Sequence, residues 1–437
     1  RGCGVSMSSI DTPTHLCVAH FGGNQGPGYP FFLSAVWQLS NFSFHWVRIL
    51  QALIISISII RLCYSIDLFF KNKNFLIFTG IVLSLSPFTL AWSRYLQTES
   101  LSLAIIILIV SELLISIKLN KIKILNISLL FLVSTWIRLD NIFLIIPIAV
   151  AILVIEDLKN SFKKFAILGL IFLVPWGSWT IRNITSGVNN IIPTDMIMPG
   201  GSRSPSGYLA WVKTWITNEY ERPLVLWNVN KKIYSTIEIP SYAYKNEKEK
   251  EKIEYLLKKI SVLDGQSFPK DIDDSFLEIA ELKRKIYLKD YWLINPLKRS
   301  VRLWLNPFSS LGWPSEMPDL GLSKQDRLNA SLGNSEIILS KIKAYPYHAA
   351  AKLTVLLYKI LIYLGIVFVL WKLIYTREKN INIFLQITIS FFLIKTMFSA
   401  FNGNVETRYS VPVLIFFEVL VIYTILFSLK NKKKSLK

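Results

Sequence analysis

The 437-residue sequence is poor in residues that mark several common protein classes. It has only four histidines and three cysteines, and charged residues make up 18%, below the roughly 25% of soluble chains. So few histidines disfavour histidine chemistry. No metal-ligand spacing, Walker loop, nucleotide-binding glycine signature or Ser/His/Asp order is visible. The sequence therefore offers no familiar soluble-enzyme motif.

Apolar residues are abundant instead and occur in long blocks. Hydrophobic residues make up 52% of the chain and the mean hydropathy is +0.41. A bilayer core about 30 Å thick needs about 20 apolar residues per helix, and several blocks have that length. This pattern predicts a polytopic membrane protein and excludes secreted, disordered and ordinary cytosolic classes.

The formal net charge of +20 invites a nucleic-acid interpretation, but its distribution argues against one. Lys and Arg stand in short clusters between apolar blocks, as topology signals do. The cysteines add little: Cys63 lies in an apolar block, and Cys3 and Cys17 would pair only on an oxidising side. No signal peptide is visible, and we expect one further helix before Arg1.

Nine membrane spans are expected, with alternate connections on opposite sides. One set of connections carries 16 Lys and Arg residues and the other carries four, so the first set and the C-terminus are cytoplasmic. A single long span over 124–156 would break this asymmetry. We therefore expect a hairpin whose tip, Arg138-Leu139-Asp140, is buried among other helices. The nine spans are 44–66, 75–93, 101–117, 124–137, 141–156, 165–180, 351–371, 381–400 and 411–429.

The segment 183–349 has the mixed charge of a soluble domain and is expected outside. Amphipathic helical patterns occur at 245–260, 273–290 and 324–343. The predicted fold class is thus an all-α polytopic membrane protein with a mostly helical extracytoplasmic domain. The predicted regions are an outer loop at 1–43, spans at 44–182, the outer domain at 183–349, and spans with a basic tail at 350–437.

Charged residues inside the spans need a reason because they are costly there. Arg61 and Glu112 share a depth near the cytoplasmic side, and we interpret them as a structural ion pair or as snorkelling side chains. Lys359, Lys395 and Glu418 share a depth of about 10 Å below the outer surface. One lysine would pair with Glu418, and the cluster would either be structural or bind a lipid phosphate.

The outer ends of the spans carry further charged and polar residues at one membrane level. Carboxylates and guanidiniums gathered there suit a reaction on a lipid-borne phosphate, with a carboxylate as base and arginines holding the anion. For each residue alone, an ordinary interfacial charge is the simpler interpretation. The set comprises Asp11, His15, Arg94, Glu99, Arg182, Glu406 and Arg408.

At these positions the sequence resembles the GT-C superfamily of membrane glycosyltransferases. It is similar to the branch of protein O-mannosyltransferases and the lipid A aminoarabinose transferase, whose first helix we expect before Arg1. His15 stands where that family usually has Tyr, and one carboxylate replaces its usual acidic pair. The matching pieces are DTPTHLCVA, GPGYPFFLSAVWQL, SRYLQTESLSLAI, TWIRLDNIFLIIP, PWGSWTIRN, RSVRLWLNP and ETRYSVPVLIF.

The resemblance implies an inverting glycosyltransferase that moves a sugar from a polyprenyl-phosphate carrier to a glycan, lipid or protein acceptor. By resemblance, Asp11 is the catalytic base. Arg182 and Arg408 bind the donor phosphate, to which the residues themselves add Lys395 and Lys359. No cofactor is required, and metal dependence stays open. The expected substrate-cavity residues are His15, Tyr29, Arg94, Glu99, Arg138, Glu406 and Tyr409.

The expected location is a bacterial inner membrane, with the site at its outer face and no nucleic-acid partner. A lipid-linked glycan ligase or polymerase is a near alternative. A non-enzymatic lipid or glycan transporter such as a flippase is a more distant one, because no internal repeat is visible and the outer domain suits acceptor recognition.

Overall fold

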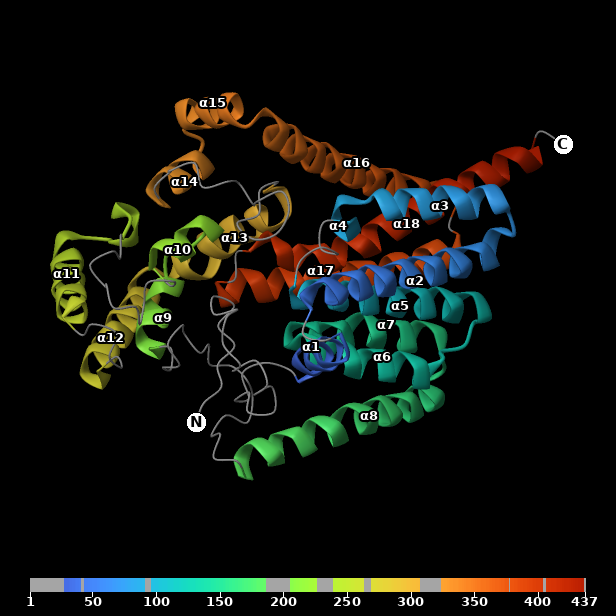
Figure 1. Ribbon diagram of the computed structural model, residues 1–437, viewed down its shortest axis with the longest axis horizontal. Coiled ribbons are helices and arrows are strands. Elements are labelled where there is room, and N and C mark those ends of the chain that lie inside the picture. The colour runs from blue at the N-terminus through green and yellow to red at the C-terminus, as the bar shows by residue number, and fades with distance from the viewer. Residues whose placement is uncertain are drawn as a thin grey trace. The chain divides into compact units, whose positions relative to one another are not determined.

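The computed structural model contains helices and no strand in the residues that it describes, which are 27–40, 43–90, 96–185, 205–225, 239–262, 269–306, 324–376, 378–403 and 406–435 (Figure 1). Six helices are long and apolar enough to cross a membrane. The expected class, an all-α multi-spanning membrane protein, is confirmed. The six are α2 (Phe44–Phe70), α5 (Thr98–Leu119), α8 (Leu158–Thr185), α16 (Pro346–Thr376), α17 (Lys379–Asn402) and α18 (Val411–Ser435).

The nine expected spans are not confirmed, because three of them coincide with helices that are too short. The helix α3 (Lys73–Leu85) has 13 residues, or about 20 Å, against a bilayer core of about 30 Å. It ends at Leu85 because the next residue, Ser86, precedes Pro87 and is pushed out of the helical region. A short helix, α4 (Pro87–Leu90), follows. The other two are α6 (Ile124–Ile137) and α7 (Ile145–Ile155).

The break between α6 and α7 confirms that 124–156 is not one helix. Arg138 adopts an extended conformation, and the 3-10 helix η3 (Leu139–Leu144) leads into α7. The amide of Arg138 and the side chain of Asn141 both donate to the Ser134 carbonyl, at 2.9 and 3.0 Å. The Arg138 bond is the last helical hydrogen bond of α6, and the Asn141 side chain adds a second donor to the same carbonyl.

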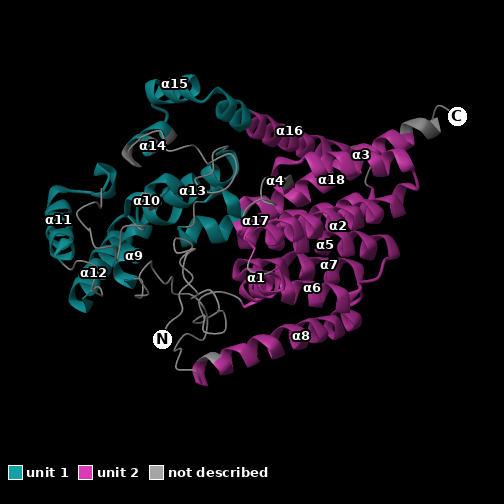
Figure 2. Ribbon diagram, in the orientation of Figure 1, with its two compact units in different colours: residues 1–12, 194–353, 396–409 teal, residues 13–193, 354–395, 410–437 magenta. Residues whose placement is uncertain are grey.

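The chain divides into two compact units, which are coloured separately in Figure 2. Unit 1 contains the described residues of 194–353 and 396–409. Unit 2 contains those of 13–193, 354–395 and 410–437. The division falls within the helices α16 and α17.

Unit 2 is organised around α5, in whose most apolar stretch 89% of the residues are buried. This helix packs against α2, α6, α7 and α18 (Figure 1). The short helix α1 (Gly28–Leu39) contacts α2 and α6, and a Cβ at Gly28 would lie 2.9 Å from the backbone of Trp136. The Arg61–Glu112 ion pair joins α2 to α5 at 2.7 Å, as expected from the sequence.

Unit 1 has its own core, formed mainly by α9 (Ser206–Lys213) and α12 (Lys270–Ile286) around Tyr208, Trp211 and Phe276. The amphipathic patterns are confirmed by α11 (Glu247–Ser261), by α12, and by α14 (Lys324–Ser331) with α15 (Ser335–Ala344), which a turn at Gly333 (φ +99°) separates. The remaining elements are η4 (Glu219–Glu221), α10 (Arg222–Val225), η6 (Ser241–Ala243), the π-helical turn η7 (Asp290–Ile294), α13 (Asn295–Leu305) and η8 (Thr407–Ser410).

Candidate active site

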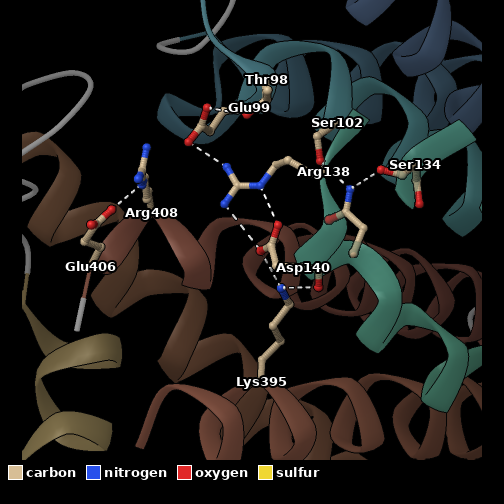
Figure 3. Close-up of polar contacts among 10 residues, drawn as sticks. Thr98, Glu99, Ser102, Ser134, Arg138, Asp140, Lys395, Glu406 and Arg408 are labelled. Atoms are coloured by element: carbon tan, nitrogen blue, oxygen red, sulfur yellow. Dashed lines mark hydrogen bonds and ion pairs between the residues drawn. The ribbon is translucent and has the colours of Figure 1, made fainter. Parts of the chain in front are cut away.

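A chain of four alternating charges lies at the tip of the α6–α7 hairpin in unit 2 (Figure 3). Arg138 Nη1 lies 2.6 Å from Glu99 Oε1, and Arg138 Nε lies 2.6 Å from Asp140 Oδ1. Lys395 Nζ donates to Asp140 Oδ2 at 2.9 Å and to the Asp140 carbonyl at 3.1 Å. Two cations and two carboxylates thus form one neutral network, called the tip network below.

The tip network is almost closed to solvent. The side chain of Lys395 is 1% exposed, and those of Glu99, Arg138 and Asp140 are between 9% and 16% exposed. Charges buried to this extent are tolerated only when they are paired and hydrogen-bonded. The expectation that the hairpin tip is buried among other helices is therefore confirmed.

Local backbone structure explains how Arg138 reaches both carboxylates. Its extended conformation follows the last turn of α6, while Asp140 lies two residues later in the first turn of η3. Asn141 donates to Ser102 Oγ on α5 at 2.7 Å, which ties the tip to the helix that carries Glu99. The guanidinium is thereby fixed between α5 and η3 in the fork geometry that suits arginine.

Tyr29 on α1 belongs to the same neighbourhood. Its hydroxyl accepts a hydrogen bond from Gln51 Nε2 at 3.2 Å. Burial raises the pKa of this hydroxyl above its ordinary value, the Gln51 bond lowers it by less, and the nearby charge of Glu99 adds a smaller increase. Tyr29 and Glu99, both expected in a substrate cavity, are thus close in the fold.

The partner of Lys395 differs from the one considered in the sequence. Its ammonium binds Asp140 rather than Glu418, and it also lies 5.6 Å from the centre of the Phe143 ring. Glu418 instead accepts a hydrogen bond from Ser86 Oγ at 2.5 Å and is bonded by the Tyr358 hydroxyl. The idea that Lys395 is left with an excess charge for a phosphate to neutralise is therefore wrong.

The remaining expected site residues occupy several other places. Lys359 is buried on α16, and Arg182 lies in the last turn of α8, 5.0 Å from the centre of the Trp179 ring. In unit 1, Glu406 and Arg408 form an ion pair, and Arg408 lies 5.3 Å from the centre of the Tyr409 ring. Asp11, His15 and Arg94, like Cys3 and Cys17, lie outside the described residues.

Sequence reasoning singled out Arg138 and Glu99 but did not assign Asp140 or Asn141 to the site. The signal available was the charged pair Arg138 and Asp140 at the tip of an otherwise apolar hairpin. Among the residues that the structure describes, no group of three His, Cys, Asp or Glu side chains is placed to hold a metal ion.

The family model of the dolichyl-phosphate-mannose-protein mannosyltransferases matches residues 24–179. This segment is a GT-C superfamily domain. The matched segment contains Tyr29 and three members of the tip network, Glu99, Arg138 and Asp140. It begins after Asp11 and ends before Arg182.

Neither a curated protein nor a solved structure shows significant similarity to the chain. The family match by itself indicates a mannosyltransferase-like membrane glycosyltransferase. Such an enzyme uses a lipid-linked sugar donor and an acceptor at a membrane. The apolar helices agree with a multi-pass membrane location.

Proposed function

We propose that this protein is an inverting glycosyltransferase that uses a polyprenyl-phosphate-linked sugar at the outer face of a bacterial inner membrane. The observation that carries the proposal is the family match over 24–179, which includes Glu99, Arg138 and Asp140 of the buried tip network. A pre-formed, nearly dry arrangement of charges is the kind of environment in which electrostatic stabilisation of a charged leaving group is strongest.

In this proposal, the acceptor hydroxyl attacks C1 of the sugar while the C1–O bond to the lipid phosphate breaks. The Asp11 carboxylate takes the hydroxyl proton, and the polyprenyl phosphate leaves with the bonding electron pair. Attack opposite to the leaving group inverts the configuration at C1. Arg182, Arg408 and Lys359 supply positive charge for the departing phosphate.

The tip network acts in this scheme by positioning. Lys395 and Glu99 hold the two ends of the network, so that Arg138 and Asp140 keep one orientation. Arg138 binds Glu99 through Nη1 and Asp140 through Nε and Nη2, so both carboxylates hold the guanidinium in place. Lys395 therefore contributes through Asp140.

The proposal is tested by a transfer assay with purified full-length protein and a short-chain polyprenyl-phosphate mannose. The expected product is a mannoside whose anomeric configuration is opposite to that of the donor. A retained configuration would contradict the inverting mechanism. Movement of lipid across proteoliposomes with no glycosidic bond formed would favour the transporter alternative.

The role of Asp11 is tested by Asp11→Asn, which keeps the size of the side chain and removes its basicity. Loss of a general base slows transfer about a hundredfold or more. The matched control is Asp326→Asn, an acidic residue in α14 outside the proposed site. Transfer at the wild-type rate by the Asp11 variant would remove Asp11 from the mechanism.

A further inference from the structure

Unit 1 contains a cavity of about 400 Å³ in its described part, within the range of about 300–1,000 Å³ that is usual for small-molecule sites. One side is formed by α13, which contributes Asn295, Lys298 and Arg302. Lys298 and Arg302 are four residues apart, so their side chains lie on the same face of the helix. Two cations thus share one side of the cavity.

The carboxylates of the cavity are already engaged. Glu221 Oε2 accepts hydrogen bonds from the backbone amides of Thr217 and Asn218, at 2.6 and 3.0 Å, and Oε1 accepts one from the Tyr242 hydroxyl at 2.7 Å. Asp290 Oδ2 is paired with Lys245 Nζ at 2.5 Å. Neither carboxylate therefore needs Lys298 or Arg302.

The two cations on α13 are less fully engaged: within the described part of unit 1, Lys298 has no carboxylate partner and Arg302 has only a long ion pair with Glu221. Lys298 is exposed, and no described carboxylate lies within hydrogen-bond distance of it. Arg302 Nη1 donates to Thr217 Oγ1 at 2.8 Å and lies 3.9 Å from Glu221 Oε1, which is too far for a hydrogen bond. Like charges at this helical spacing repel each other, and a bound anion would relieve the repulsion.

Part of the cavity lining is aromatic. Trp215 and Tyr242 both line the cavity, with their ring centres 6.2 Å apart. Trp215 is 4% exposed, and its indole N–H has no hydrogen-bond partner among the described residues. A buried polar group without a partner is unusual and costly. The Trp215 N–H is closed to solvent, whereas the Tyr242 ring is 43% exposed and presents an aromatic face that suits the C–H face of a sugar ring.

We infer that this cavity binds an acidic saccharide, a sugar that carries a phosphate or a carboxylate, as part of the acceptor. Lys298 and Arg302 bind the acidic group, and the Tyr242 ring contacts the sugar ring. The inference names the substrate class of the acceptor and so rests on the proposed function. A sugar phosphate and a sugar carboxylate share the same recognisable feature, an anionic group attached to a sugar.

The test is calorimetric titration of the detergent-purified full-length protein without lipid donor. The probes are mannose 6-phosphate, glucuronate, mannose and inorganic phosphate. We expect at least one acidic sugar to bind in the millimolar range or tighter and to bind more tightly than mannose or inorganic phosphate. The preferred acidic sugar then identifies phosphate or carboxylate as the recognised group.

Variants connect the binding to the cavity. We expect Lys298→Gln and Arg302→Gln each to weaken the acidic sugar about tenfold, which corresponds to about 1.4 kcal/mol. The control Lys258→Gln removes an exposed lysine of α11 outside the cavity and should change nothing. Since Lys298 is exposed and makes no described side-chain contact, its variant keeps the test valid if Arg302→Gln does not fold.

Three results would overturn the inference: no acidic sugar binds, both variants bind it with unchanged affinity, or inorganic phosphate binds as tightly as the sugar phosphate. The titration contains no donor and measures no transfer. A failed titration therefore leaves the glycosyltransferase proposal standing, and a failed transfer assay leaves the binding result standing.

Discussion

Lys395 on α17 and Asp140 in η3 form a buried ion pair at 2.9 Å although 255 positions separate them in the sequence. The Asp140 carboxylate also forms an ion pair with Arg138, which in turn binds Glu99 on α5. The pair therefore connects α17 to the hairpin tip and fixes the orientation of the arginine. Several consequences can be measured.

Replacing Lys395 by Met is expected to destabilise the protein. The substitution leaves the largely buried Asp140 without one of its two cations, and breaking a buried pair typically costs about 3–5 kcal/mol. Adding Asp140→Asn should recover part of this loss, and Lys73→Met, an exposed lysine of α3, should lose none. Thermal unfolding in detergent measures the wild type, Lys395→Met, Asp140→Asn, the double variant and the Lys73→Met control. Additive losses in the double variant would show that the two side chains are not coupled.

Replacing Arg138 by Lys is expected to slow transfer while leaving most of the stability in place. Lysine keeps the positive charge but cannot bind Glu99 and Asp140 together through a planar fork. Because Glu99 and Asp140 are then no longer held in place together, we expect kcat to fall about a hundredfold, with a smaller change in KM. The control Arg48→Lys alters an exposed arginine of α2. Equal kcat values for Arg138→Lys and wild type would exclude a positioning role.

The buried Glu221 predicts a pH dependence of stability. Burial raises the pKa of its carboxyl above the ordinary value, although hydrogen bonds from Tyr242 and from two backbone amides oppose the shift. A raised folded-state pKa gives stability that is fully present below the unfolded pKa and is lost as pH rises through the folded pKa. As pH rises from the unfolded-state pKa of Glu221 through its folded-state pKa, the wild type should therefore lose stability relative to Glu221→Gln. Melting curves from about pH 4 to pH 7 measure the difference. A constant difference between the two proteins would contradict the shift.

The predicted orientation can be tested by labelling with membrane-impermeant thiol reagents. A cysteine at the exposed position Lys258 of α11 should react in spheroplasts, because unit 1 is expected outside. A cysteine at Asn431, near the end of α18, should react only after lysis. Both positions are exposed, so accessibility within the fold does not limit either reaction. Labelling of Asn431 in closed spheroplasts would reverse the orientation and move the site to the other face.

Local patterns in the sequence were sufficient for the secondary structure and for contacts that share an obvious depth. The apolar blocks predicted the long helices, and the Lys clusters on either side of 124–156 predicted the break between α6 and α7. Arg61 and Glu112 could be paired because both lie at a similar distance from the cytoplasmic ends of their helices. The lengths of the helices were predicted less well. The expected second span, 75–93, is interrupted before Pro87, and α3 therefore has only 13 residues.

Partners within the membrane required the tertiary structure. The sequence gives the depth of Lys395, Lys359 and Glu418 but not the rotation of each helix about its axis. A rotation decides whether Lys395 faces Glu418 or Asp140, and whether Glu418 faces a lysine or Ser86, which lies 332 positions away. The cavity of unit 1 depends likewise on packing among η4, η6, η7 and α13. The sequence by itself determined which charges are buried, whereas only the packing of the helices decided which of them meet.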